Sequence, residues 1–333
     1  MRLPRLVAVL AITLATLAPT VRASATDTAQ PLRPEEGQIE RLYRAVFDRS
    51  PDPEGFAYWF RLRSTTTSLE TIAAEFITSP EFAAVAGAPS DDEFVVRLYR
   101  NVLDREPDAD GLEYWRQTMA AGLTRVGLLV LFSESAEFVA STDTVLEPLP
   151  PFRASIEPVD AFELGASWRA GCPVGPADLV QIEMSTVGFD GKASTGTLIV
   201  HRSVAEAVVT VFSQLYDQRY PIEQMVPVSR FDGDDNASMA ANNTSAFNCR
   251  AVTSGASWSR HAYGRAIDVN PRQNPYVRGE VVLPPDGADF VVRNVHHPAM
   301  IRRGDIVVEA FAAAGWRWGG DFTTLVDWQH FER

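Results

Sequence analysis

Residues 259–271 read SRHAYGRAIDVNP, and residues 327–333 read DWQHFER. The first stretch supplies His261 and Asp268, and the second supplies His330. Two imidazoles and one carboxylate form a three-ligand set for Zn²⁺ that leaves one coordination position open. An open position is typical of catalytic zinc sites, whereas structural sites are closed by a fourth protein ligand.

Two short segments predict how these side chains meet. Residues 266–270 alternate small or polar side chains with β-branched ones, so a strand would expose Asp268 on one face. Residues 328–332 predict a second strand with His330 on one side. If the two strands are neighbours and the intervening loop turns back, His261, Asp268 and His330 converge on one point.

The remaining acidic and histidine side chains near these motifs are not predicted to be metal ligands, with one exception. Asp327 lies at the turn before the second predicted strand, as a carboxylate near the metal that is not needed as a ligand. That is the position of a general base that takes a proton from the attacking water. His201 lies in a strand-like run, and residues 296–297 predict a solvated loop. His297 is the only alternative ligand that this pattern leaves open.

The motifs are S-x-H-x-x-G-x-A-x-D over residues 259–268 and D-x-x-H-F-E over residues 327–332. Together they resemble the VanY-type D-alanyl-D-alanine carboxypeptidase family of zinc peptidases, whose members cut short peptides of bacterial cell walls. The similarity extends upstream through residues 238–250. It implies Zn²⁺ as the cofactor, with Asp327 as catalytic base and with three zinc ligands: His261, Asp268 and His330.

The same resemblance suggests roles for side chains around the metal. Arg250 is expected beside it, where a guanidinium would hold the substrate carbonyl or the oxyanion. Ser259 and Glu332 are candidates for orienting the ligands. The acidic loop at residues 232–236 either braces Arg250 or forms an exposed turn, and turn chemistry favours the second interpretation.

Residues 1–25 have the composition of a secretory signal peptide. Arg2 and Arg5 precede an apolar run at residues 6–17, and residues 23–25 form a small-x-small cleavage site. We therefore expect a secreted protein, extracellular or associated with the cell wall, with no membrane span once the signal is cleaved. An uncleaved amino-terminal anchor is the alternative.

The charge of the chain bears on its partners. The formal net charge is −13, and residues 1–25 hold three arginines and no acids, so the exported chain carries −16. Such a charge argues against nucleic acid as a partner and against passive adhesion to anionic lipids or wall polymers. The remaining length of about 300 residues predicts two domains.

An internal repeat occupies residues 38–140. RLYRAVFDRSPDPEGFAYW at 41–59 returns 56 positions later as RLYRNVLDREPDADGLEYW at 97–115. Helical spacing of apolar residues around a Pro-Asp-x-x-Gly break predicts, for each copy, a helical hairpin plus a third helix, and so an all-α domain. This region resembles a bacterial domain family of unknown function, which implies neither a reaction nor a partner. Its acidic loops lack standard calcium-loop spacing, and turn formation and capping explain them as well as calcium would.

The proline-rich residues 141–164 predict a semi-rigid, non-helical linker. Residues 165–333 then predict an α+β domain with a small antiparallel sheet. Its expected strands lie at 179–186 and 196–201, and its expected helices lie at 205–216 and 306–314.

The two cysteines, Cys172 and Cys249, both lie in the second domain. In an exported protein such a pair favours a disulfide, which for a loop of this length stabilises the fold by on the order of 4 kcal/mol. The bond would also tether the segment that carries Arg250. Two buried thiols are the alternative.

These patterns predict an exported zinc metallopeptidase, and the family resemblance implies that it hydrolyses peptide bonds in peptidoglycan stem peptides. The reaction is expected to be of the D-Ala-D-Ala carboxypeptidase or the L-Ala-D-Glu endopeptidase type. The competing hypothesis is a non-catalytic wall-binding or scaffold protein with a structural metal site. Asp327 argues against the latter, because a closed structural site needs no spare carboxylate.

Overall fold

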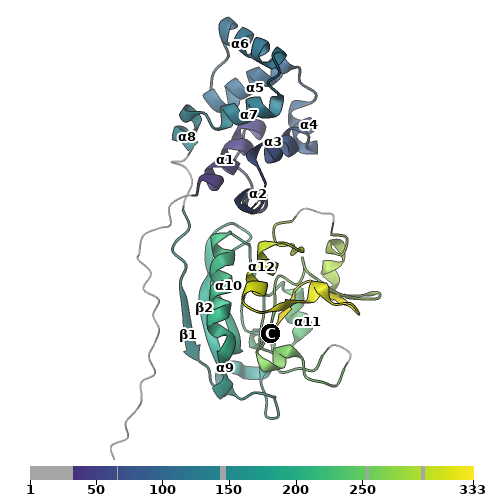
Figure 1. The fold of residues 1–333 in the computed structure, drawn as a ribbon. Coiled ribbons are helices and arrows are strands. Elements are labelled where there is room, and N and C mark those ends of the chain that lie inside the picture. The colour runs from purple at the N-terminus through teal and green to yellow at the C-terminus, as the bar shows by residue number, and fades with distance from the viewer. Residues whose placement is uncertain (1–32, 66, 143–147, 253–254, 294–296) are drawn as a thin grey trace, which may run out of the picture.

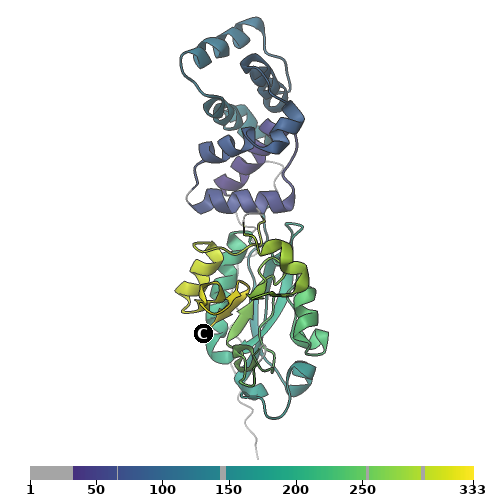
Figure 2. The same cartoon turned by 90° about the vertical axis from the view of Figure 1, so that its right-hand side faces the viewer.

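The computed structural model describes residues 33–65, 67–142, 148–252, 255–293 and 297–333. The predicted signal peptide lies outside these residues. A helical domain and a mixed α/β domain are stacked end to end (Figures 1 and 2). This two-domain organisation agrees with the prediction. No helix in the described part of the chain is long and apolar enough to cross a membrane.

The helical domain contains two copies of the repeat, and each copy folds into four helices rather than the three predicted. The fourth helix follows from a recurring serine: the side chain of Ser79 accepts a hydrogen bond from the backbone of Phe82, and Ser135 does the same for Phe138. A serine in this position starts a helix. The first copy comprises α1 (Pro34–Phe47), α2 (Pro53–Thr65), α3 (Leu69–Ile77) and α4 (Pro80–Ala86), and the second α5 (Asp91–Leu103), α6 (Ala109–Ala120), α7 (Arg125–Ser133) and α8 (Ala136–Thr142).

The acidic loops of the repeat terminate and start helices. Asp48 and Asp104 end α1 and α5 in the left-handed conformation. Asp52 and Asp108 accept hydrogen bonds from the backbone N–H groups of the glycines three residues later, at 2.8 and 2.7 Å. Each of these four carboxylate residues therefore has a local structural role.

The mixed domain is built on three small antiparallel sheets. Their strand orders are β1-β2-β3, β4-β9-β7 and β6-β5-β8. The strands are β1 (Ala154–Pro158), β2 (Leu179–Val187), β3 (Ala193–His201), β4 (Ala266–Asp268), β5 (Tyr276–Arg278), β6 (Val281–Leu283), β7 (Arg317–Trp318), β8 (Val326–Asp327) and β9 (His330–Glu332). The helices are α9 (Ala161–Leu164), α10 (Ala205–Asp217), α11 (Asp235–Ala240) and α12 (Ile306–Ala313).

One apolar core holds these elements together. Helix α10 lies along β2, and α12 packs against α10 and β7, as Figure 1 shows for the two helices. The fully buried side chains of Phe212, Phe311 and Phe331 meet in this core, and the last two rings stack with their centroids 4.0 Å apart. Phe331 lies between His330 and Glu332, so the core fixes the strand that carries both.

The segment predicted as a linker differs from expectation. Within residues 141–164, β1 pairs with β2, with Ile156 opposite Ile182, and α9 follows it. The prolines are compatible with this strand because β1 is at the edge of its sheet and Pro158 is its last residue. The ordered sheet therefore begins earlier in the chain than predicted.

The strand predicted for residues 328–332 is shorter than expected, because residues 328–329 connect two strands that belong to different sheets. Strand β8 ends at Asp327 and pairs with β5, whereas β9 starts at His330 and pairs with β4 and β7. Trp328 and Gln329 connect them: the carbonyl of Trp328 accepts a hydrogen bond from the Trp318 ring, and the carbonyl of Gln329 accepts one from Val269. These two hydrogen bonds fix residues 328–329, where the chain passes from one sheet to the other.

Candidate metal centre

Three side chains converge where the two predicted segments meet. His261 lies in a short 3₁₀ turn (Arg260–Tyr263), Asp268 ends β4, and His330 begins β9 directly opposite Asp268. The Nε2 atom of His261 lies 3.2 Å from Oδ2 of Asp268 and 3.2 Å from Nδ1 of His330. The Nδ1 atom of His330 lies 2.9 Å from Oδ1 of Asp268. In the described part of the chain, these three residues form the one group of His, Cys, Asp and Glu side chains close enough to hold a metal ion.

Hydrogen bonds on the outer side of each imidazole define which nitrogen faces the centre. The Nδ1 atom of His261 lies 2.5 Å from the backbone carbonyl of Ala246, to which it donates. The Nε2 atom of His330 lies 3.3 Å from Oε2 of Glu332. Because each outer nitrogen has an acceptor, Nε2 of His261 and Nδ1 of His330 are the ring nitrogens that can bind a metal, and binding would displace the proton that His330 donates to Asp268.

The spacing of the three donor atoms fits a zinc ion. Bonds of about 2.0–2.1 Å at tetrahedral angles place neighbouring ligand atoms about 3.3 Å apart. The separations of 2.9 to 3.2 Å involve both oxygens of Asp268, Oδ1 toward His330 and Oδ2 toward His261, and one donor atom from each residue lies within 4.8 Å of the other two. Nitrogen, oxygen and nitrogen donors are also a set that Zn²⁺ accepts. The residues present therefore fit the metal that the family resemblance implies.

The electrostatics of the cluster favour a cation. Burial alone would lower the pKa of His330, but hydrogen bonds to Asp268 and Glu332 outweigh it and raise the pKa to about 10. Burial opposes the charge on Asp268, yet His261 and His330 hold the pKa of this carboxyl well below its usual range. The side chains of all three residues are at most one-tenth exposed. A positive charge is therefore stabilised at this point of the fold.

Asp327 faces the same region from the neighbouring sheet. It pairs with Tyr276 through β8 and β5, and its Oδ1 has no hydrogen-bond partner among the residues described. Burial raises the pKa of Asp327 to about 7; Asp268 adds to this effect, whereas His330 and Arg250 oppose it. A carboxyl with a pKa near neutrality and an unused oxygen is suited to accept and return a proton.

Arg250 reaches this region from a third segment. Its Nε atom lies 2.8 Å from Oδ1 of Asp235, an ion pair in which both side chains are about one-fifth exposed. Cys249, the preceding residue, forms the predicted disulfide with Cys172. The predicted acidic loop thus has two roles, because Asp235 contacts Arg250 while Asp234 caps the start of α11.

His261 and His330 of the cluster line an open cleft of about 390 Å³, and Asp268 lies behind them. The walls of the cleft include Arg250, Trp258, Arg260, Phe322, Asp327 and His330. A substrate can therefore approach the candidate metal centre from solvent, and both Asp327 and Arg250 line the cleft that it would enter.

The remaining predicted site residues occupy supporting positions. The hydroxyl of Ser259 accepts a hydrogen bond from the backbone N–H of His261 at 3.3 Å and so starts the turn that carries this histidine. Glu332 bonds to His330 and also pairs with Arg317, and the His330 bond lowers the pKa of its carboxyl. Both residues therefore lie where they can orient a ligand.

His297 and His201 lie apart from the candidate centre. The ring of His297 contacts Phe189 and Phe290, and its Nε2 lies 3.7 Å from Glu54 of the helical domain. Its side chain is 14% exposed, so the prediction of a solvated loop is wrong for this residue, because the helical domain covers it. His296 is outside the described residues. His201 bonds to Ser203.

Sequence reasoning missed one position that shapes the site. A Cβ on Gly319 would lie 2.5 Å from the carbonyl oxygen of Asp327 and 3.1 Å from Cβ of His330. Only a glycine allows the backbone to pass between the proposed base and the proposed ligand. The Gly-Gly pair at 319–320 was the one sequence signal for this position. A Gly-Gly pair also predicts an ordinary turn, and the sequence does not show that Asp327 and His330 pack against it.

A cleft beside a candidate three-residue metal site and a nearby carboxyl is an arrangement that can support metal-dependent hydrolysis. Residues 253–333 match a protein-family model described as D-alanyl-D-alanine carboxypeptidase, which confirms the predicted resemblance for this region. Residues 73–142 match a domain of unknown function (DUF4214). No curated protein and no solved structure matches the chain. The first match includes the three candidate ligands and Asp327, whereas Arg250 precedes it.

Proposed function

We propose that the protein is an exported zinc peptidase that acts on peptidoglycan stem peptides. The observation that carries this proposal is the convergence of His261, Asp268 and His330, because both histidines and Asp327 line one open cleft. The match of residues 253–333 to a carboxypeptidase family supports the substrate class. The signal-like composition of residues 1–25 supports action outside the cytoplasm.

The residues divide the chemistry among them. Zn²⁺ held by the three donors would supply a Lewis acid that polarises the scissile carbonyl and lowers the pKa of the attacking water. Asp327 takes the proton of that water and delivers it to the leaving amine. Arg250, held by Asp235 and anchored beside the disulfide, donates to the oxyanion that develops on the carbonyl. Glu332 and Ala246 keep the two imidazoles in the tautomers that binding requires.

The cleft offers a second positive charge for a carboxylate of the substrate. Arg260 lines the same cleft as Arg250. A second guanidinium offers a partner for the free carboxylate of a terminal D-alanine, because guanidinium groups bind carboxylates in a bidentate manner. The D-glutamate that follows L-alanine in a stem peptide also carries a free α-carboxylate, because its γ-carboxyl continues the chain, so Arg260 is compatible with both reactions.

Mass spectrometry of products from defined muropeptides tests the proposal. We expect release of terminal D-alanine, abolished by a chelator and restored by Zn²⁺. Cleavage between L-alanine and D-glutamate would instead assign the endopeptidase reaction. Tight zinc binding with no new amine on any muropeptide would refute the peptidase and favour a scaffold with a structural metal.

A further inference from the structure

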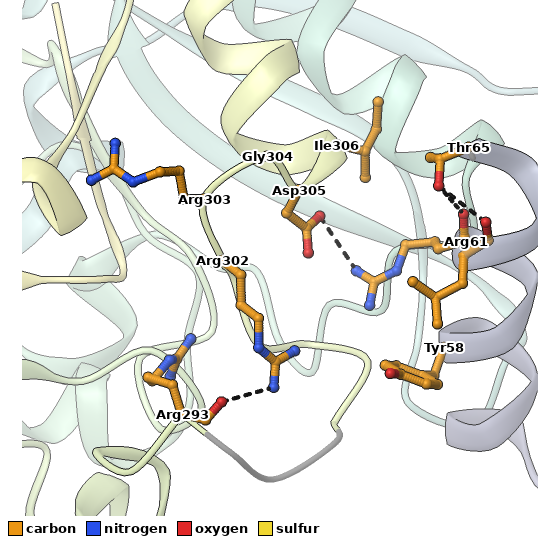
Figure 3. Close-up of a pocket in the computed structure, with 10 residues that line it drawn as sticks. Tyr58, Arg61, Thr65, Arg293, Arg302, Arg303, Gly304, Asp305 and Ile306 are labelled. Atoms are coloured by element: carbon orange, nitrogen blue, oxygen red, sulfur yellow. Dashed lines mark hydrogen bonds and ion pairs between the residues drawn. The ribbon is translucent and has the colours of Figure 1, made fainter. Parts of the chain in front are cut away.

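A second cavity lies between the two domains, and its lining is distinct from that of the metal centre. It has a volume of about 420 Å³. Helix α2 of the repeat domain contributes Tyr58, Arg61, Leu62 and Thr65 to one wall. Arg293 and residues 302–306 of the mixed domain form the other wall (Figure 3).

The charge in this cavity is unusual for so acidic a protein. Arg61, Arg293 and Arg302 line it, the last two with hydrogen bonds to backbone carbonyls, and Arg303 forms an ion pair with Asp321. The one carboxylate in the lining belongs to Asp305. Three positive charges therefore meet one negative charge inside a chain whose net charge is −13.

That carboxylate only weakly offsets the charge of Arg61. Its Oδ1 atom lies 3.9 Å from Nη1 of Arg61, a distance too long for a hydrogen bond (Figure 3). The same oxygen accepts a hydrogen bond from Val307 and so caps the start of α12. The negative charge of Asp305 is therefore shared with the helix terminus.

Arg61 is a buried group that lacks a full set of hydrogen-bond partners, as is Arg293 at its Nε. Its side chain is 8% exposed, and within the described ranges its Nη1 has no hydrogen-bond partner. The face of the Tyr220 ring lies 5.1 Å from its guanidinium carbon. A desolvated guanidinium without an acceptor is unfavourable. An oxyanion in the cavity would relieve this cost.

The neighbouring arginines supply both rigidity and positive potential. Arg293 is held by the backbone carbonyls of Gln273 and Ile301, at 2.6 and 2.7 Å. Burial lowers its pKa to about 10, and the charge of Arg302 contributes to the same shift. The pKa of His297 is likewise lowered to about 4, by burial first and then by Arg61 and Arg302. These shifts agree with an excess of positive charge.

We propose that this interdomain cavity is a binding site for a small ligand that carries a carboxylate or phosphate group. Arg61 of the helical domain and Arg302 of the mixed domain would hold its oxygens, because guanidinium groups match the geometry of both groups. Leu62 and Ile306 in the lining provide contacts for an apolar part of the ligand. A ligand bound there bridges the two domains.

Calorimetric titration of the full chain with inorganic phosphate, and separately with succinate, tests this site and distinguishes the two anion chemistries. Sodium chloride at matched ionic strength controls for general screening. We expect saturable binding of at least one anion, together with an increase in Tm. Binding of phosphate alone would assign a phosphate-bearing ligand, and binding of succinate alone a carboxylate-bearing one. Absence of saturable binding of both probes would overturn the proposal.

Variants connect the binding to the cavity. Arg61→Met retains most of the stem while removing the charge, and it should weaken anion binding roughly tenfold or more. Arg63→Met is the matched control, because Arg63 lies on the same helix but bonds to Gln38 and does not line the cavity. Arg302→Met provides a second test if Arg61→Met fails to fold, which circular dichroism would detect. Equal affinity in the wild type and in the folded cavity variants would overturn the assignment.

Discussion

Replacing Asp327 by asparagine should separate turnover from stability. The carboxyl of Asp327 has a pKa raised by burial from its ordinary 3.8 to about 7. Since the folded state binds this proton more tightly than the unfolded state, the stability that the carboxyl contributes is present at low pH and is lost as the pH rises through 7. A shift of that size corresponds to at most about 4 kcal/mol at pH 8, and relaxation of neighbouring charges reduces it to about 1–4 kcal/mol.

The asparagine variant removes this cost because its side chain stays neutral at every pH. In metal-free protein we expect Asp327→Asn and the wild type to be similarly stable near pH 4, and the variant to be more stable by about 1–4 kcal/mol at pH 8. Urea unfolding followed by tryptophan fluorescence measures the difference at each pH. Asp289→Asn, at an exposed position, is the control and should show little change with pH.

The same variant should lose activity while keeping its metal. Loss of a general base typically costs about 10²- to 10⁴-fold in rate, so turnover of a muropeptide should fall by at least about 100-fold with zinc content unchanged. A fully active variant would remove Asp327 from the mechanism. A stability difference that does not vary with pH, or that favours the wild type at pH 8, would refute the electrostatic reasoning.

Three further outcomes are expected. His330→Ala should abolish both zinc binding, measured by atomic absorption, and turnover, whereas retained zinc with normal affinity would exclude this histidine as a ligand. Gly319→Ala should destabilise the protein by about 1–3 kcal/mol in urea unfolding and reduce kcat. The reason is that the added Cβ would lie 2.5 Å from the carbonyl oxygen of Asp327. An unchanged kcat would show that the backbone moves to accept the methyl group without displacing Asp327. Cys172→Ser should lower the unfolding free energy by about 2–5 kcal/mol, and a change below 1 kcal/mol would contradict the predicted contribution.

Local patterns were sufficient to predict much of the fold. Apolar spacing predicted a helix at 205–216, and α10 occupies Ala205–Asp217; alternation predicted the strands that became β2 and β3. The proximity of the three proposed ligands could also be expected, since two of them share a short segment and the third lies on a strand of matching pattern. The helix and the strands depend on residues close together in the chain, whereas the meeting of His330 with Asp268, 62 positions earlier, was expected from the family motif.

Features that depend on distant partners were not predictable. The division of residues 326–332 between two sheets requires knowledge of β5 and β7, which the local alternation does not contain. The fourth helix of each repeat depends on a serine cap that reads equally well as a turn. The basic cavity joins α2 to residues 302–306 across the domain boundary, and no periodicity connects them.

The division between β8 and β9 gives the centre two independent supports. The candidate ligand His330 is held by β4 and β7, while the candidate base Asp327 is held by β5. A substitution on β5, for example at Val277, can therefore move the proton acceptor without altering the coordination sphere. Metal affinity and catalytic rate can therefore vary separately. Substitutions in the β6-β5-β8 sheet can change the catalytic rate while the metal affinity stays the same.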